Sequence, residues 1–140
     1  MTEPLVYTFL VDGDNFTSAG EASVKMKKNL RMLGVAPDAI RRVAIAMYEG
    51  EINMVIHAGG GTATVSVYHD KIEIVLEDKG PGIADVELAM REGFSTASDN
   101  IRNLGFGAGM GLPNMKKNTD CMTIESTVGV GTRIAMTVNL

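Results

Sequence analysis

The segment 37–58 most constrains the fold, because it is apolar on almost every face of the helix that its sequence predicts. Pro37 suits the first turn of a helix, and the glycine run that begins at Gly59 ends it. A helix that is apolar all round must be central and buried. It nevertheless carries Glu49 and Asn53, which are four residues apart and therefore share one face. The segment predicts a core helix with one polar row.

The remaining chain alternates between helix-like and strand-like patterns. Apolar residues recur at three- and four-residue steps over 15–33, which predicts another long helix. Consecutive strand patterns lack crossover helices between them, which favours strands joined directly to their neighbours. We therefore expect an α+β fold: a two-layer sandwich in which helices cover one face of a mixed β-sheet, an antiparallel sheet being the alternative. Strands are expected at 5–11, 62–69, 72–76, 122–126 and 132–138, and short helices at 86–92 and 113–118.

Length and charge limit the classes of protein to which the chain can belong. A chain of 140 residues suits a single domain, 1–140, with a buried core. The net charge of −4 gives no basic footprint for nucleic acid, so local geometry would have to hold a phosphate ligand. The single cysteine, Cys121, excludes an internal disulfide and fits a reducing compartment. No segment approaches the ~20 apolar residues of a membrane span. We expect a cytoplasmic protein that binds neither nucleic acid nor membrane.

The polar row of the central helix could form part of a magnesium site. A buried carboxylate is costly unless a charged or hydrogen-bonding group meets it. Asn53 could ligate a magnesium ion through its side-chain oxygen, and Glu49 could polarise a hydroxyl or water for attack on a γ-phosphate. A helix with one exposed polar stripe is the simpler interpretation of these two residues alone. His57, one turn further along, is more typical of a hydrogen-bonded structural residue than of a ligand.

An acid followed by glycines forms the second motif. Asp78 ends an apolar strand pattern, directly before Gly80, Pro81 and Gly82. A turn alone would explain the glycines and the proline. A carboxylate at the floor of a pocket could instead accept the exocyclic amino hydrogen of adenine, and the glycines would allow the backbone to approach a ring or sugar. This motif alone fits a turn and a nucleotide site equally well.

A glycine loop forms the third motif. Its backbone N–H groups, with the start of the helix that follows, could cradle an anion, although a flexible low-complexity loop is the alternative. The loop is not a P-loop, because no Gly-Lys-Ser/Thr follows, and the irregular segment before it argues against a dinucleotide fingerprint. The three motifs in this order predict a magnesium–nucleotide pocket. The glycines stand at alternate positions: Gly105, Gly107, Gly109 and Gly111.

Together these motifs resemble the ATP-binding domain of the Bergerat-fold (GHKL) superfamily, and within it the bacterial anti-sigma-factor serine kinases and switch-protein kinases. The resemblance covers nearly the whole chain, with 84–108 similar to the ATP lid. Within the first motif the sequence departs from the family's pattern at Gly50, Glu51 and Met54. The matching segments are Glu49-Gly-Glu-Ile-Asn53 for the N box, Asp78-Lys-Gly80-Pro-Gly82 for the first glycine box and Gly107-Ala-Gly109-Met-Gly111 for the second.

The resemblance implies a role for each matched residue. Glu49 would be the catalytic base, Asn53 the magnesium ligand, and Asp78 the acid that reads adenine. Further positions implied to bind ATP are Gly80, Gly82, Gly107, Gly109, Gly111 and Thr132.

The implied activity is that of a Mg-ATP-dependent serine/threonine protein kinase. It would phosphorylate or sequester a small regulatory protein, either an anti-anti-sigma-like protein or a sigma factor. One alternative is a nucleotide-gated binding module without significant kinase activity. Another is a histidine-kinase-type catalytic domain acting in trans. The choice between monomer and homodimer stays open.

Overall fold

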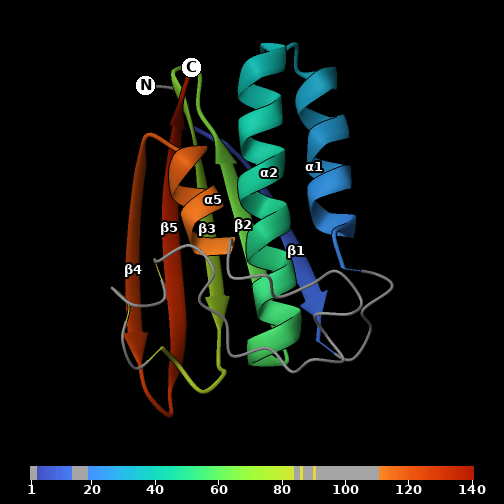
Figure 1. The fold of residues 1–140 in the computed structure, drawn as a ribbon. Coiled ribbons are helices and arrows are strands. Elements are labelled where there is room, and N and C mark those ends of the chain that lie inside the picture. The colour runs from blue at the N-terminus through green and yellow to red at the C-terminus, as the bar shows by residue number, and fades with distance from the viewer. Residues whose placement is uncertain (1–2, 14–18, 84–85, 87–89, 91–110) are drawn as a thin grey trace.

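The computed structural model describes residues 3–13, 19–83, 86, 90 and 111–140. Within these ranges the strands form one five-stranded sheet in the order β1-β2-β3-β5-β4 (Figure 1). All four pairings are antiparallel. Two of them, β2–β3 and β4–β5, are hairpins, and the other two join β1 to β2 and β3 to β5. The sheet expected as mixed is therefore antiparallel over its described strands. The strands are β1 (Leu5–Asp12), β2 (Gly60–Val67), β3 (Lys71–Asp78), β4 (Cys121–Thr127) and β5 (Gly131–Asn139).

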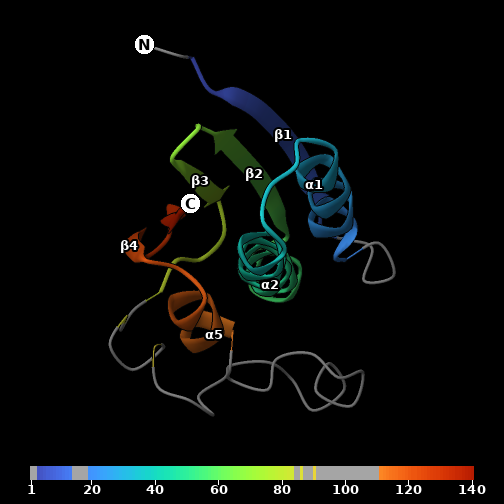
Figure 2. The same ribbon diagram turned by 90° about the horizontal axis from the view of Figure 1, so that it is seen from above.

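The helices lie on one face of the sheet, as Figure 2 shows. They are α1 (Glu21–Met32), α2 (Pro37–Asn53) and α5 (Gly111–Lys117), and α2 continues into a π-helical turn, η2 (Met54–Ala58). Together α2 and η2 cover the predicted central helix, which ends at Gly59 with a φ of 72°. The first helix was predicted to start at about residue 15, which lies outside the described residues. Gly20 has a left-handed φ of 96°, so the helix begins after it.

The core lies between α2 and the sheet. On the helix, Val43 and Met47 are fully buried. On the sheet, the alternate residues of the central strands β3 and β5 point toward the helices and are buried there. The two-layer α+β architecture is thereby confirmed. The buried strand residues are Ile72, Ile74 and Leu76 on β3 and Ile134, Met136 and Val138 on β5.

Several predictions for the middle of the chain fall outside the described residues. These are the lid at 84–108 and most of the short helix at 86–92, where the structure describes only Val86 and Met90. The carbonyl oxygen of Val86 accepts a hydrogen bond from the backbone N–H of Met90 at 3.0 Å. In the described ranges no helix is both long and apolar enough to cross a lipid bilayer.

Candidate functional site

Two side chains of α2 meet the first turn of α5. Glu49 accepts a hydrogen bond from the side chain of Asn114. A β-carbon built on Gly111 would lie 2.8 Å from Asn53 Nδ2 and 3.0 Å from its Oδ1, so the amide of Asn53 lies against the first residue of α5. The structure thus brings the predicted polar row of α2 to the point where the glycine loop ends. Gly105, Gly107 and Gly109 lie outside the described residues.

The environment of Glu49 suits a proton acceptor. The side chain is half-buried, and this burial raises the pKa of its carboxyl, while the hydrogen bond from Asn114 lowers it in part. A carboxylate with a raised pKa binds a proton more readily than an exposed glutamate does. Asn114 was not predicted from the sequence. Its position three residues after Gly111, one turn into the helix, was the available signal.

Asp78 lies at the end of β3, directly opposite Thr132 on β5. Its Oδ1 accepts the backbone N–H of Gly80 at 2.9 Å and that of Thr132 at 3.2 Å. Among the described residues, the hydrogen bonds of this carboxylate all go to Oδ1. A carboxylate can accept about four hydrogen bonds. The half-buried Asp78 is therefore fixed by one oxygen and retains the capacity of Oδ2 to accept from a ligand.

Gly80 and Gly82 allow segments of the protein backbone to approach each other. A β-carbon on Gly80 would lie 2.6 Å from the Cα of Ala58, at the end of η2. Gly82 has a φ of 79°, and a β-carbon there would lie 2.5 Å from the carbonyl oxygen of Thr127. Gly80 and Gly82 thus allow the loop after β3 to pack closely between η2 and the β4–β5 turn. Their predicted contact with a base stays a prediction.

A pair of hydroxyl groups lies beside Asp78. Thr132 is only 8% exposed, and its Oγ1 lies 2.8 Å from Ser126 Oγ on β4. Ser126 Oγ also accepts the backbone N–H of Ile83 at 2.7 Å. Ser126 therefore ties the loop after β3 to the sheet. It was not predicted, because a single serine in a strand gives no local signal.

Metal binding by side chains alone has little support here. Within the described ranges, no group of three or more His, Cys, Asp or Glu side chains could hold a metal ion. His57 is half-buried on η2, and this burial lowers the pKa of its imidazole. Magnesium commonly takes one or two protein oxygens and completes its shell with water and phosphate oxygens. Asn53 Oδ1 fits that kind of shared coordination.

Glu51 and Gly50 have structural reasons to depart from the family's pattern. Glu51 is 2% exposed, and its carboxylate accepts three backbone N–H bonds from the start of α1: Gly20 at 3.0 Å, Ala22 at 3.1 Å and Ser23 at 2.7 Å. Burial raises the pKa of Glu51 more than these bonds lower it. A β-carbon on Gly50 would collide with the side chain of Leu76. The N box therefore also holds α1 and the sheet against α2.

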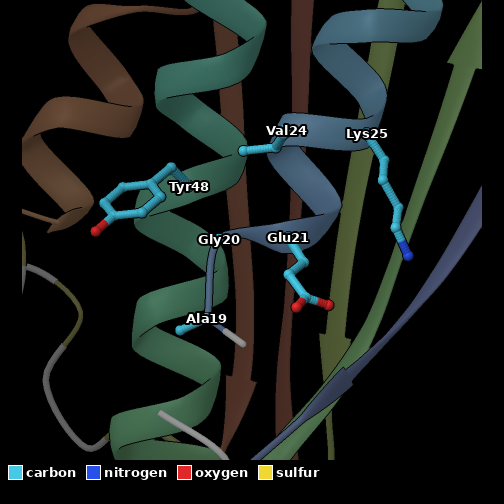
Figure 3. A pocket seen from close by; sticks show the side chains of 6 residues that line it. All are labelled: Ala19, Gly20, Glu21, Val24, Lys25 and Tyr48. Atoms are coloured by element: carbon cyan, nitrogen blue, oxygen red, sulfur yellow. The ribbon is translucent and has the colours of Figure 1, made fainter. Parts of the chain in front are cut away.

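A pocket of about 290 Å³ lies between the start of α1 and the exposed ring of Tyr48 on α2 (Figure 3). Gly20 lies directly against that ring, since a β-carbon on Gly20 would lie 2.9 Å from Tyr48 Cε1. None of the predicted site residues lines it. The residues that line it are Ala19, Gly20, Glu21, Val24, Lys25 and Tyr48.

Comparisons with known proteins identify relatives of this chain. The family described as "Histidine kinase-, DNA gyrase B-, and HSP90-like ATPase" matches residues 39–140. The serine/threonine-protein kinase RsbT of Bacillus subtilis (strain 168) is 34% identical over 97 residues, which span 66% of this chain and 67% of RsbT. An anti-sigma F factor of Caldanaerobacter subterraneus subsp. tengcongensis is 36% identical over 105 residues, 71% of this chain and 70% of that protein.

Solved structures extend the likeness at the level of the fold. The SiaB–SiaC complex from Pseudomonas aeruginosa contains a chain that superposes with a TM-score of 0.58. The match covers 99% of this chain and 91% of that chain, with 9% sequence identity. At this identity the likeness shows the shared fold alone.

Proposed function

Because this chain belongs to the family of histidine kinase-, DNA gyrase B- and HSP90-like ATPases, as its motifs predicted, we propose that it is an ATP-dependent serine/threonine protein kinase of the anti-sigma-factor type. The observation that carries the proposal is the convergence of Glu49 and Asn53 on the first turn of α5. The names of the two relatives support it, since one is a serine/threonine-protein kinase and the other an anti-sigma factor.

Glu49 acts as the general base in this proposal. It accepts the proton of a serine or threonine hydroxyl while that oxygen attacks the γ-phosphorus of ATP and ADP leaves. Two features support this role: burial raises the pKa of Glu49 and so favours its protonated form more than water does, and the hydrogen bond from Asn114 fixes the carboxylate. Asn114 is then a positioning residue for the base.

The nucleotide contacts follow the sequence motifs. Asn53 would contribute its amide oxygen to a magnesium ion shared with the phosphates of ATP. Asp78 and Thr132 would face the adenine, near Gly80 and Gly82. Gly107, Gly109 and Gly111 would border the phosphates. The contact of Asn53 with Gly111 supports a common site for the metal and the phosphates.

The proposed partner is a small regulatory protein of sigma-factor control, either an anti-anti-sigma-like protein or a sigma factor. The relatives named anti-sigma F factor support this class of partner. A cytoplasmic location stays a prediction from the sequence, as does the choice between monomer and homodimer.

The same names favour a second candidate function. A chain similar to anti-sigma factors could act as a nucleotide-gated binding module, in which ATP and ADP change the affinity for the partner without significant phosphoryl transfer. The family description also includes histidine kinases, which supports a histidine-kinase-type domain acting in trans as a third candidate.

Labelled ATP and a candidate partner, such as the product of a neighbouring gene, separate these functions. The wild type should transfer an acid-stable label to a serine or threonine of the partner. Glu49→Gln should bind ATP but lose about 10²–10⁴-fold in turnover. Glu125→Gln, a charge removal on the exposed side of β4, is the matched control and should resemble the wild type.

Two results would contradict the kinase proposal. If partner binding responds to ATP and ADP while no label is transferred, and Glu49→Gln behaves like the wild type, the binding module stands instead. An acid-labile label would indicate transfer to histidine.

A further inference from the structure

Three polar side chains form a row across β3, β5 and β4. Asp78 is paired directly with Thr132, and Thr132 is paired directly with Ser126. Directly opposite residues of antiparallel strands project to the same face, which here is the face covered by the helices. The next two rows on that face are apolar throughout: Leu76–Ile134–Ile124 and Ile74–Met136–Met122. The polar row therefore replaces an apolar row at one end of the core.

The hydrogen bonds of Ser126 limit where its single hydroxyl hydrogen can go. The backbone N–H of Ile83 can only donate, so Ser126 Oγ accepts from it at 2.7 Å. Two acceptors remain for the hydroxyl hydrogen, Thr132 Oγ1 at 2.8 Å and the carbonyl oxygen of Gly131 at 3.3 Å. Hydroxyl donors favour distances near 2.7–2.8 Å. Two arrangements fit these distances: Ser126 donates to Thr132 Oγ1, or Thr132 donates to Ser126 Oγ while Ser126 donates to the carbonyl oxygen of Gly131.

We propose that Ser126 is a positioning residue that determines nucleotide specificity by donating to Thr132 Oγ1, so that the Thr132 hydroxyl donates its own hydrogen to the nucleotide base. This inference rests on the proposed function, because it assumes that Asp78 and Thr132 face the base. A hydroxyl has one hydrogen, and an oxygen that already accepts from Ser126 turns that hydrogen elsewhere. Asp78 Oδ2 then presents an acceptor and Thr132 a donor at the same end of the sheet.

This acceptor–donor pair matches one edge of adenine. The edge carries a donor, the exocyclic amino group, beside an acceptor, the ring nitrogen N1. Guanine reverses both, with a carbonyl oxygen beside a ring N–H. In the proposed arrangement Ser126 occupies one of the two acceptor lone pairs of Thr132 Oγ1. Without Ser126 both lone pairs are free, which makes it easier for Thr132 to accept from a guanine N–H. Ser126 should therefore contribute to the preference for adenine at the ring nitrogen, whereas Asp78 contributes at the amino group.

Calorimetric titration with three magnesium nucleotides tests this assignment: ATP, GTP and an ATP analogue in which C–H replaces the ring nitrogen N1. The wild type should bind ATP about three- to tenfold more tightly than the analogue, the loss of one neutral hydrogen bond. Ser126→Ala should bind the analogue and ATP nearly equally, and its preference for ATP over GTP should shrink. Ser126→Thr, which keeps the hydroxyl, should restore both preferences.

A purely structural role would weaken all three nucleotides by the same factor, so the ratios of affinity are decisive. Thr123→Ala, which removes a hydroxyl from the exposed side of the same strand, should leave the ratios unchanged. Equal binding of ATP and the analogue by the wild type would overturn the proposal even if Ser126→Ala does not fold. Unchanged ratios in a folded Ser126→Ala would overturn it while the proposed kinase function stands. A wild type that binds no ATP would overturn both.

Discussion

Burial and one hydrogen bond from Asn114 together set the acidity of the proposed base. Burial raises the pKa of Glu49, and the Asn114 amide lowers it in part. In Asn114→Ala the pKa should therefore rise further. A general base works only when it is deprotonated, so the acid limb of the kcat/KM profile should move to higher pH. Phosphoryl transfer measured across pH checks this. As a control, Lys116→Ala changes an exposed residue of α5 and should leave the acid limb of the profile in place. If the acid limb moves to lower pH in Asn114→Ala, Asn114 is not the residue that lowers the pKa of the base.

The proposed adenine contact can be tested at Asp78 while the hydrogen bonds that this residue accepts from the backbone are kept. In Asp78→Asn the amide oxygen can still accept the N–H groups of Gly80 and Thr132, whereas the second oxygen becomes an NH2 donor. That donor would face the amino group of adenine. Affinity for ATP should fall roughly ten- to hundredfold, which corresponds to about 1–3 kcal/mol. Wild-type affinity by calorimetric titration would remove Asp78 from the site.

At the scale of elements, Glu51 joins α1 to α2. Glu51→Ala would leave three backbone N–H groups at the start of α1 without their partner. Leaving such groups unsatisfied costs about 1–3 kcal/mol, so the free energy of unfolding should fall by at least this amount. Urea unfolding followed by circular dichroism measures the change.

The matched control for Glu51 is Glu21→Ala, which removes an exposed acid from the same first turn of α1. An exposed charge at a helix start contributes only about 0.3–1 kcal/mol. If Glu51→Ala costs no more than this control, the buried carboxylate does not hold α1 in place.

Local patterns predicted most elements, and contacts between distant segments account for what they missed. The apolar pattern of 37–58 and the alternation along β2 and β3 are visible in the chain itself. The start of α1 was not, because the acid that caps it, Glu51, comes from another helix. Ser126 and Asn114 were missed for the same reason. Their roles depend on strand register and on the packing of α5 against α2, neither of which leaves a local trace.

For the whole molecule, the nucleotide should act as a stabiliser. A ligand that binds only the folded chain adds about 2.7 kcal/mol to the free energy of unfolding at a hundredfold excess over Kd. We expect magnesium and ATP together to raise the melting temperature more than ATP with a chelator does. Asn53→Ala should lose the magnesium-dependent part of that rise, because a metal ligand already acts in the ground state.

Thermal unfolding with and without magnesium measures this difference. Asn29→Ala, which removes a side-chain amide from α1, is the matched control and should keep the full rise. A magnesium effect of wild-type size in Asn53→Ala would exclude Asn53 as the ligand.

The pairing of β3 with β5 also has a consequence for the time course of folding. The hydrogen bond from Thr132 to Asp78 joins residues 54 positions apart, whereas each of the flanking hairpins closes a short turn. Local hairpins form faster than long-range pairings, so the two halves of the sheet should assemble separately before they join. Doubling such a loop costs only about 0.6 kcal/mol in closure entropy. Because α5 and β4 also lie between β3 and β5, only insertions outside these two elements should be tolerated at so low a cost.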